Sequence, residues 1–181
     1  MRKALLLLIL TGMLLVSGCA SNGDQENTMV QEGDLISVNY IGQLDDGTIF
    51  DTSFEDVAKE AGQYNPARGY EPLEFTVGAS RLIAGFDAGV VGMTVGEEKT
   101  VVIPAAEAYG EYDEERVQPV PISQLKEKDI EPEVGMLLNT ISGQQVPIVR
   151  MDETNAYVDN NYPLAGETLT FQITLVSIGQ D

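Results

Sequence analysis

The stretch Leu169-Thr-Phe-Gln-Ile-Thr-Leu175 carries the clearest structural pattern of this 181-residue chain. Hydrophobic residues alternate strictly with polar ones along it. Because successive side chains of a strand point to opposite faces of its sheet, this alternation predicts a β-strand with one buried face. The block Asn161-Tyr-Pro-Leu-Ala-Gly166 leads into the strand, and we pair it with Ala108-Tyr109-Gly110, which lies well upstream. We interpret the gap between these two segments as one domain inserted into another.

Four upstream segments predict further strands of the same sheet. Residues 35–44 alternate, and Asp45-Asp46-Gly47 then favours a tight hairpin into residues 48–51. Residues 73–77 alternate in the same way, and residues 99–103 follow a turn. Between the last two strands, Leu82, Ile83, Phe86 and Val90 recur at helical spacing. One short helix among many strands predicts an α+β fold, an antiparallel β-sheet wrapped around the helix.

Together these segments resemble the FKBP-type peptidyl-prolyl cis-trans isomerases. The resemblance rests on Val38-Asn39-Tyr40, Phe50-Asp51, Ala108-Tyr109 and the Leu-Ala-Gly that follows Pro163. It implies an isomerase domain formed by residues 33–116 and 160–181. The intervening residues 117–159 resemble the insertion of the SlyD-like branch, which implies a small, β-rich, chaperone-like domain.

The resemblance also implies a substrate pocket. The catalytic residues that it implies are Tyr109, Asp51 and Phe86. The substrate-binding residues that it implies are Tyr40, Phe50, Leu73, Leu82, Ile83, Ala108 and Phe171. Two positions depart from the family pattern: Phe86 stands where many members have tryptophan, and Tyr162 stands where SlyD-like proteins commonly have histidine.

The implied reaction requires no nucleophile. Amide resonance opposes rotation of a peptide bond by about 18–20 kcal/mol, and a catalyst need only stabilise the twisted state of an X-Pro bond. An apolar pocket can remove water from the imide carbonyl while Phe86 and Ile83 hold the proline ring. Tyr109 and the backbone amide of Ile83 are candidate donors to substrate carbonyls. Asp51 either orients Tyr40 or meets the twisted carbonyl electrostatically, and the sequence leaves both roles open.

The inserted stretch has its own pattern of short elements. Pro119, Pro121 and Pro132 are expected to interrupt its beginning, and residues 123–125 favour one helical turn. Candidate strands follow at residues 136–141, 145–150 and 156–158. Their hydrophobic side chains supply either a groove for unfolded chains or only a small core, and the sequence does not decide between these alternatives.

The segment between Phe54 and Pro72 is longer than the corresponding stretch of a minimal FKBP domain, and we call it the extra segment. Ser53 with Asp56 resembles a helix capping box, residues 57–61 favour a helix, and Gly62 can end it. This segment either covers the edge of the sheet or contacts the substrate.

The N-terminus resembles a lipoprotein signal peptide over residues 1–18. A positively charged start precedes an apolar run that is shorter than the roughly 20 residues of a membrane-spanning helix. The sequence Leu15-Val-Ser-Gly-Cys19 is similar to a lipobox, in which Cys19 would receive the lipid. An uncleaved N-terminal anchor is the alternative. Residues 19–32 contain the polar run Ser21-Asn-Gly-Asp-Gln-Glu-Asn-Thr28 and are expected to form a flexible linker.

The composition excludes several classes of function. The chain has no histidine and one cysteine, so the usual general base and the commonest metal ligand are missing, and we expect no cofactor and no metal. Removing residues 1–18 deletes Arg2 and Lys3, which leaves 8 basic and 29 acidic side chains and a formal charge of −21. This charge disfavours binding to nucleic acid and indicates a well-solvated surface.

The sequence therefore predicts a membrane-tethered prolyl isomerase with chaperone activity for exported proteins. We expect it to be an extracytoplasmic monomer held to a membrane by its lipid anchor. Its expected partners are unfolded or partly folded proteins with X-Pro bonds. The alternative is a lipoprotein binding or assembly module that keeps the FKBP fold with negligible isomerase activity.

Overall fold

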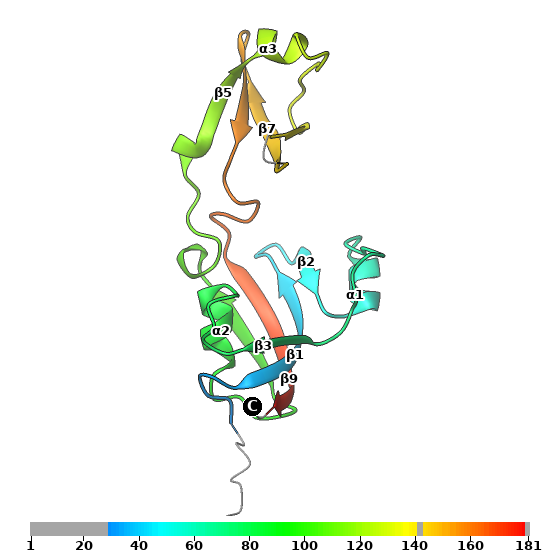
Figure 1. The fold of residues 1–181 in the computed structure, drawn as a ribbon, viewed down its shortest axis with the longest axis vertical. Helices are drawn as coiled ribbons and strands as arrows, with labels where there is room; N and C mark the ends of the chain where they lie inside the picture. The colour runs from blue at the N-terminus through cyan, green and yellow to red at the C-terminus, as the bar shows by residue number, and fades with distance from the viewer. Residues whose placement is uncertain (1–28, 141–142, 180–181) are drawn as a thin grey trace, which may run out of the picture.

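The computed structural model describes residues 29–140 and 143–179. Their strands form two antiparallel sheets, with the orders β2-β1-β9-β4, where β3 also pairs with β1, and β5-β8-β7-β6. The two sheets lie toward opposite ends of an elongated molecule (Figure 1). Within the described ranges, no helix is both long and apolar enough to cross a membrane.

The first sheet combines segments from both sides of the insertion. Its strands are β1 (Leu35–Gln43), β2 (Ile49–Thr52), β3 (Leu73–Thr76), β4 (Glu98–Ile103) and β9 (Leu169–Gly179). The strand with the clearest alternation, β9, lies between β1 and β4, and its residues 169, 171, 173 and 175 are all buried. All five predicted strands are present, and the predicted α+β class is confirmed.

Helix α2 (Ala84–Val90) packs closely against this sheet. A Cβ atom at Gly85 would lie 2.4 Å from the side chain of Ile103 on β4, so the close approach requires glycine. Phe86 and Val90 are buried in the core between helix and sheet. The helix begins after the predicted start because Ile83 has an extended backbone, with φ −63° and ψ 139°.

Helix α1 (Glu55–Glu60) lies in the extra segment before β3. The predicted capping box is wrong, because Phe54 is the N-cap residue and no side chain caps the helix. Ser53 is buried and bonds to the sheet instead: its Oγ accepts from the Tyr40 amide at 3.0 Å and donates to Asn39 Oδ1 at 2.9 Å. Gly62 follows the helix with φ +71°, as expected for a residue that ends it.

The chain already packs against the first sheet at Val30, before β1 begins. Val30 is 1% exposed and belongs to the core of the first sheet. Its amide donates to the Met93 carbonyl, and its carbonyl accepts from the Gly92 amide, both at 2.9 Å. The predicted linker over residues 19–32 is therefore wrong at its C-terminal end. The expected signal peptide, Cys19 and the rest of that linker lie outside the described residues.

The second sheet lies within the insertion. The insertion contains the four strands of this sheet and one helix: β5 (Val117–Pro121), α3 (Ile122–Lys126), β6 (Leu137–Asn139), β7 (Gln145–Met151) and β8 (Asn155–Asp159). The predicted helical turn and three candidate strands are present. The expectation that Pro119 and Pro121 interrupt regular structure is wrong, because β5 pairs with β8 through Pro119↔Tyr157 and Pro121↔Asn155. An edge strand tolerates proline, whose missing N–H can face solvent.

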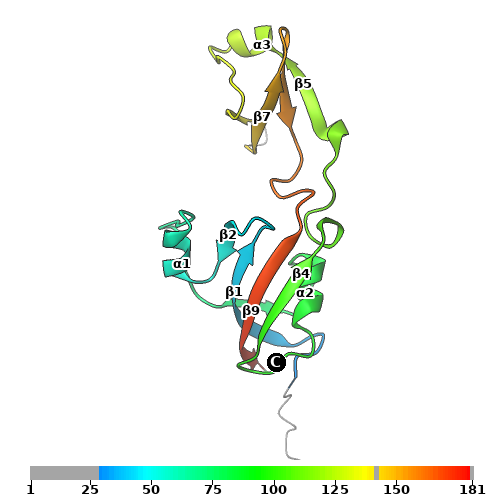
Figure 2. The same ribbon diagram turned by 180° about the vertical axis from the view of Figure 1, so that it is seen from behind.

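Two connections join the sheets, as Figures 1 and 2 show. One connection runs from β4 to β5 and contains the short 3₁₀ helices η1 (Ala105–Glu107) and η2 (Glu114–Arg116). The other runs from the end of β8, at Asp159, to β9. Hydrogen bonds hold them side by side: Asn160 donates its amide to the Arg116 carbonyl at 3.1 Å, and the buried Asn161 bonds the Asp113 backbone at 2.9 and 3.1 Å.

Candidate active site

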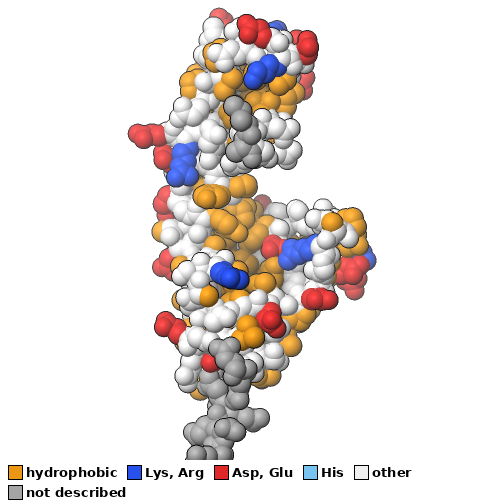
Figure 3. Space-filling model, viewed as in Figure 1, with side chains coloured by type: hydrophobic (Ala, Val, Ile, Leu, Met, Phe, Trp, Pro, Cys, Tyr) orange, Lys and Arg blue, Asp and Glu red, His pale blue; other side chains and the backbone are white. Residues whose placement is uncertain are grey.

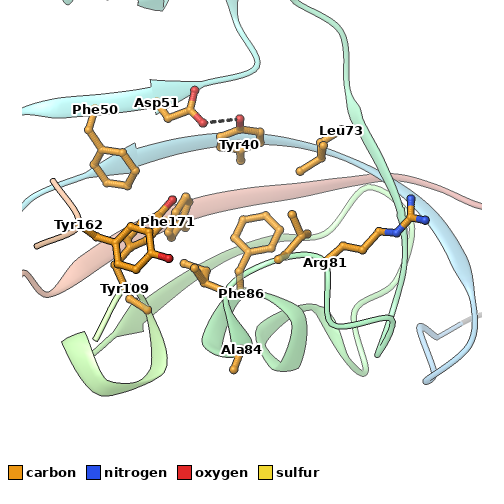
Figure 4. Close-up of a pocket in the computed structure, with 13 residues that line it drawn as sticks. Tyr40, Phe50, Asp51, Leu73, Arg81, Ala84, Phe86, Tyr109, Tyr162 and Phe171 are labelled. Atoms are coloured by element: carbon orange, nitrogen blue, oxygen red, sulfur yellow. Dashed lines mark hydrogen bonds between the residues drawn. The ribbon is translucent and has the colours of Figure 1, made fainter. Parts of the chain in front are cut away.

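A cavity of about 530 Å³ opens on the first sheet, and hydrophobic side chains gather in the hollow on this face of the molecule (Figure 3). The residues that line the cavity are Tyr40, Phe50, Asp51, Leu73, Arg81, Leu82, Ile83, Ala84, Phe86, Ala108, Tyr109, Tyr162 and Phe171 (Figure 4). All ten residues predicted for the pocket are among them. Arg81, Ala84 and Tyr162 also line the cavity, although the sequence does not assign them to the pocket.

Aromatic rings form the floor of the cavity. Phe86 on α2 is 3% exposed, and its ring lies edge-on to that of Phe171 on β9, with the centroids 5.0 Å apart. The ring centroids of Tyr40 and Phe86 lie 5.9 Å apart, and those of Phe50 and Phe171 lie 5.5 Å apart, with both pairs edge-on. Aromatic pairs prefer this geometry, so the rings hold one another in place. Gly42 makes room for them, because a Cβ atom there would lie 2.7 Å from the Phe50 ring.

A polar network forms one wall. The Tyr40 hydroxyl donates to Asp51 Oδ2 at 2.8 Å, and Arg68 Nη2 donates to the Tyr40 hydroxyl at 2.7 Å. Arg68 also forms an ion pair with Asp51 Oδ1, which accepts from the Thr52 amide as well. Burial, and then the hydrogen bond to Asp51, raise the pKa of Tyr40 to about 12. Tyr40 is therefore protonated at neutral pH, and both oxygens of Asp51 are occupied.

Two stacked tyrosines position Arg68. The rings of Tyr64 and Tyr70 lie 5.6 Å apart and nearly parallel, and the Arg68 guanidinium lies 5.5 Å from the Tyr70 ring. The hydrogen bond to Asp51 raises the pKa of Arg68, so the guanidinium stays positively charged. Arg68 is not predicted from the sequence, because it lies 17 residues from Asp51. The available signal was the pair of tyrosines that flank it. The extra segment thus supports the pocket's polar wall through the contacts of Arg68 with Tyr40 and Asp51, although Arg68 itself does not line the cavity.

Tyr109 and Tyr162 lie beside each other at the mouth of the cavity (Figure 4). Their ring centroids are 6.4 Å apart, and the side chains are 42% and 59% exposed. Neither hydroxyl makes a hydrogen bond to another described residue. The Gly166 amide donates to the Gly110 carbonyl at 2.8 Å. This bond joins the two segments that the insertion separates in sequence.

The backbone of Ile83 offers a further donor. Ile83 is the N-cap of α2, and its carbonyl accepts from the Phe86 amide at 3.1 Å. Its own N–H makes no hydrogen bond to any residue that the structure describes. An unpaired amide beside an apolar cavity can donate to a ligand carbonyl. Among the described residues, no cluster of Asp, Glu, His or Cys could hold a metal ion.

Comparison with known proteins identifies the family. The model of the FKBP-type peptidyl-prolyl cis-trans isomerases matches residues 26–176. The chain belongs to this family. It is 43% identical over 145 residues to the short-type peptidyl-prolyl cis-trans isomerase of Methanocaldococcus jannaschii, a match that covers 80% of this chain and 91% of that protein.

Two bacterial relatives extend the comparison. The FKBP-type isomerase SlyD of Vibrio cholerae is 32% identical over 152 residues, which cover 82% of this chain and 68% of that protein. A probable FKBP-type 16 kDa isomerase of Pseudomonas fluorescens is 26% identical over 145 residues, which cover 79% and 87%. The predicted enzyme class, a peptidyl-prolyl cis-trans isomerase of the FKBP type, is confirmed.

Proposed function

We propose that this isomerase accelerates rotation about X-Pro bonds by binding the twisted imide without covalent chemistry. The observation that carries the proposal is the apolar cavity with an aromatic floor and unpaired donors at its margin. The proline ring occupies the space against Phe86 and Ile83. Removing water from the imide carbonyl weakens the resonance that keeps the bond planar, because hydration favours the polar ground state.

The donors act on carbonyls of the bound chain. The Tyr109 hydroxyl, which has no competing partner among the described residues, donates a hydrogen bond to one carbonyl. The Ile83 backbone amide donates to another. A donor accelerates the reaction only where it binds the twisted state more strongly than the planar one. Asp51 orients Tyr40: its two oxygens are occupied by Tyr40 and Arg68, which leaves little capacity for a substrate.

Proline-limited refolding of a test protein examines this proposal, with the chain from Cys19 onward and its Tyr109→Phe variant. We expect the wild type to accelerate the slow phase, and Tyr109→Phe to lower kcat/KM by about 2- to 10-fold, as for the loss of one hydrogen bond. Unchanged kcat/KM in the variant would remove Tyr109 from the mechanism. If the wild type leaves the slow phase unchanged, the protein is a binding module that keeps the fold.

We propose, second, that the insertion holds unfolded chains beside the pocket. Among the described residues of the insertion, three large hydrophobic side chains are exposed: Val134 by 63%, Leu137 by 56% and Val149 by 39%. Its two edge strands differ, because β5 contains two prolines whereas β6 contains none. An edge without proline can pair with an extended main chain, and such pairing depends little on side-chain identity.

A matched pair of substitutions tests this role. Val149→Ser removes an exposed valine from the insertion, and Val102→Ser removes one that is 62% exposed on β4. We expect the first variant, especially when combined with Leu137→Ser, to suppress aggregation of an unfolded protein less well than the wild type. Equal suppression by the Val149→Ser, Leu137→Ser double variant and by Val102→Ser would contradict the proposal.

We propose, third, that a lipid on Cys19 tethers the enzyme to a membrane outside the cytoplasm, where it acts on exported proteins as a monomer. The motif Leu15-Val-Ser-Gly-Cys19 after a short apolar run supports this. Expression of the full chain and of Cys19→Ser, followed by membrane fractionation and mass spectrometry, tests it. The wild type should gain the mass of the lipid. Equal membrane retention of both forms without added mass would favour an uncleaved anchor.

A further inference from the structure

Arg81 is a charged residue of the pocket that the mechanism above does not use. It lines the cavity and comes from the loop between β3 and α2, directly before Leu82 and Ile83. Figure 4 shows Arg81 at one end of the pocket, with Tyr109 and Tyr162 at the other. A substrate chain that places its proline on the aromatic floor therefore passes Arg81 on one side.

The charge of Arg81 is not balanced within the described part of the protein. The lining residues include one other charged side chain, Asp51, and that carboxylate is paired with Arg68. Asp87, on the neighbouring helix, accepts from the Gly78 amide with both oxygens, at 3.0 and 2.9 Å. Arg81 makes no ion pair or hydrogen bond with a described residue. The pocket thus presents one net positive charge in a chain whose formal charge is −19.

The backbone before Arg81 has an unusual conformation. Ser80 has φ +56°, in the left-handed region that L-residues adopt at a cost. The bonds from Gly78 to Asp87, and from the Ala79 amide to the Thr76 carbonyl at 3.2 Å, hold the loop around it. Such local strain is found where surrounding structure fixes the direction of a functional side chain. The hydrogen bonds of the loop therefore fix the backbone position from which the Arg81 side chain extends.

We propose that Arg81 is a specificity residue that favours substrates with an aspartate or glutamate close to the proline. The inference rests on the isomerase function of the same pocket. Both partners remain solvated at the rim, so little desolvation opposes the attraction, and the gain is that of an exposed ion pair. We expect kcat/KM to rise about 2- to 5-fold. The effect lies mainly in KM, because the contact is the same in the planar and the twisted state.

Short peptides that share one X-Pro core test the proposal. Glu, Gln or Lys is placed at a position flanking the core, on the N-terminal side in one series and on the C-terminal side in the other. Each peptide is assayed with the wild type and with Arg81→Gln, Arg81→Glu and Arg81→Lys. Lys126→Gln, on α3 of the insertion, is the control, because it changes the net charge as Arg81→Gln does but lies outside the pocket.

The wild type, Arg81→Lys and Lys126→Gln should prefer the Glu peptide in at least one series. Arg81→Gln should lose this preference and Arg81→Glu should reverse it, and 1 M salt should abolish it because the screening length falls to about 3 Å. The inference is overturned if the wild type treats the three peptides alike in both series, or if Arg81→Gln keeps the preference. If no peptide is accelerated by the wild type, the isomerase mechanism fails instead.

Discussion

The two sheets of this protein differ in what their hydrophobic residues do. Among the residues that the structure describes, the core of the first sheet contains fourteen buried residues, four of them aromatic, whereas that of the second contains five, none aromatic. Large rings can both fill a core and line a cavity, and Phe86 and Phe171 do both. The second sheet is too small to enclose its apolar residues, and Leu137 and Val149 remain exposed. We infer that the aromatic cavity of the first sheet is suited to bind one defined group, the proline ring. The exposed apolar residues of the second sheet are suited to contact unfolded chains of varied sequence.

The two regions also meet at a defined place. Tyr162, at the mouth of the pocket, is three residues beyond the end of β8, and Tyr109 precedes the strand that enters the second sheet. Hydrogen bonds of Asn160 and Asn161 fix the base of the insertion there. A chain held on the second sheet is therefore held close to the cavity, and the proposed holding function raises the local concentration of X-Pro bonds.

Phe86→Ala should have the largest effect on the first region. Truncating a buried phenylalanine costs about 3–5 kcal/mol of stability and removes part of the floor that we propose holds the proline ring. We expect catalysis of a short X-Pro peptide to be lost, and urea denaturation to report the lower stability. Phe86→Leu, which keeps a large apolar side chain, should fold and retain partial activity. Wild-type kcat/KM in folded Phe86→Ala would contradict the assigned floor.

Ile148→Ala makes the corresponding change in the second region. Ile148 is fully buried there, and the truncation should cost about 2–5 kcal/mol. We expect this loss to unfold the insertion while a short X-Pro peptide is still isomerised. Circular dichroism and the peptide assay measure the two properties. Ile173→Ala, in the first sheet, should instead impair both. If Ile148→Ala abolishes peptide activity, the two regions are not separable.

Tyr40→Phe should change how stability depends on pH. The pKa of Tyr40 is raised from 10.0 to about 12, so its contribution is complete below pH 10 and is lost as the pH rises toward 12. The shift corresponds to about 3 kcal/mol. We expect the wild type to be more stable than Tyr40→Phe at pH 8 and to lose that advantage between pH 10 and 12. A constant difference in unfolding free energy across this range would contradict the raised pKa.

Arg68→Ala should have a smaller effect. Its ion pair with Asp51 is partly exposed, at 40% and 37%, and such pairs contribute about 1 kcal/mol or less. We expect kcat/KM for an X-Pro peptide to fall about 2- to 5-fold as Tyr40 and Asp51 lose their fixed geometry. Lys59→Ala breaks an exposed pair with Glu55 in the same segment and serves as the control. Equal activity of the two variants would remove Arg68 from the pocket's support.

The sequence predicts those elements whose environment repeats along the chain. In β9 one face meets the core at every second residue, so the alternation from Leu169 to Leu175 is visible without a structure. The strand β5 gives no such signal, because Pro119 and Pro121 are acceptable only at the edge of a sheet, and the position of a strand in its sheet depends on its partners. The burial of Val30 is not predictable for the same reason, because it depends on Met93, far along the chain.

The pocket divides in a similar way. Its ten predicted residues are aromatic or apolar, apart from Asp51, and their family resemblance places them together. Arg81 carries no signal in the sequence, because a charged residue in a loop usually faces solvent and only the path of the loop brings it to the cavity. For Arg68 the flanking tyrosines are the only signal, and only the path of its loop brings it to Asp51. The pattern at Ser53 predicts a helix cap, whereas its hydroxyl bonds to partners in β1. Local patterns do not record such contacts.

Excision of residues 117–159 tests most directly whether the pocket catalyses while the insertion holds the substrate. A short Gly-Ser linker can join Arg116 to Asn160, whose backbone groups already bond at 3.1 Å. The shortened enzyme should isomerise a short X-Pro peptide at the wild-type rate but accelerate proline-limited refolding of a protein at least about tenfold less. Equal loss on both substrates, or equal retention on both, would contradict it.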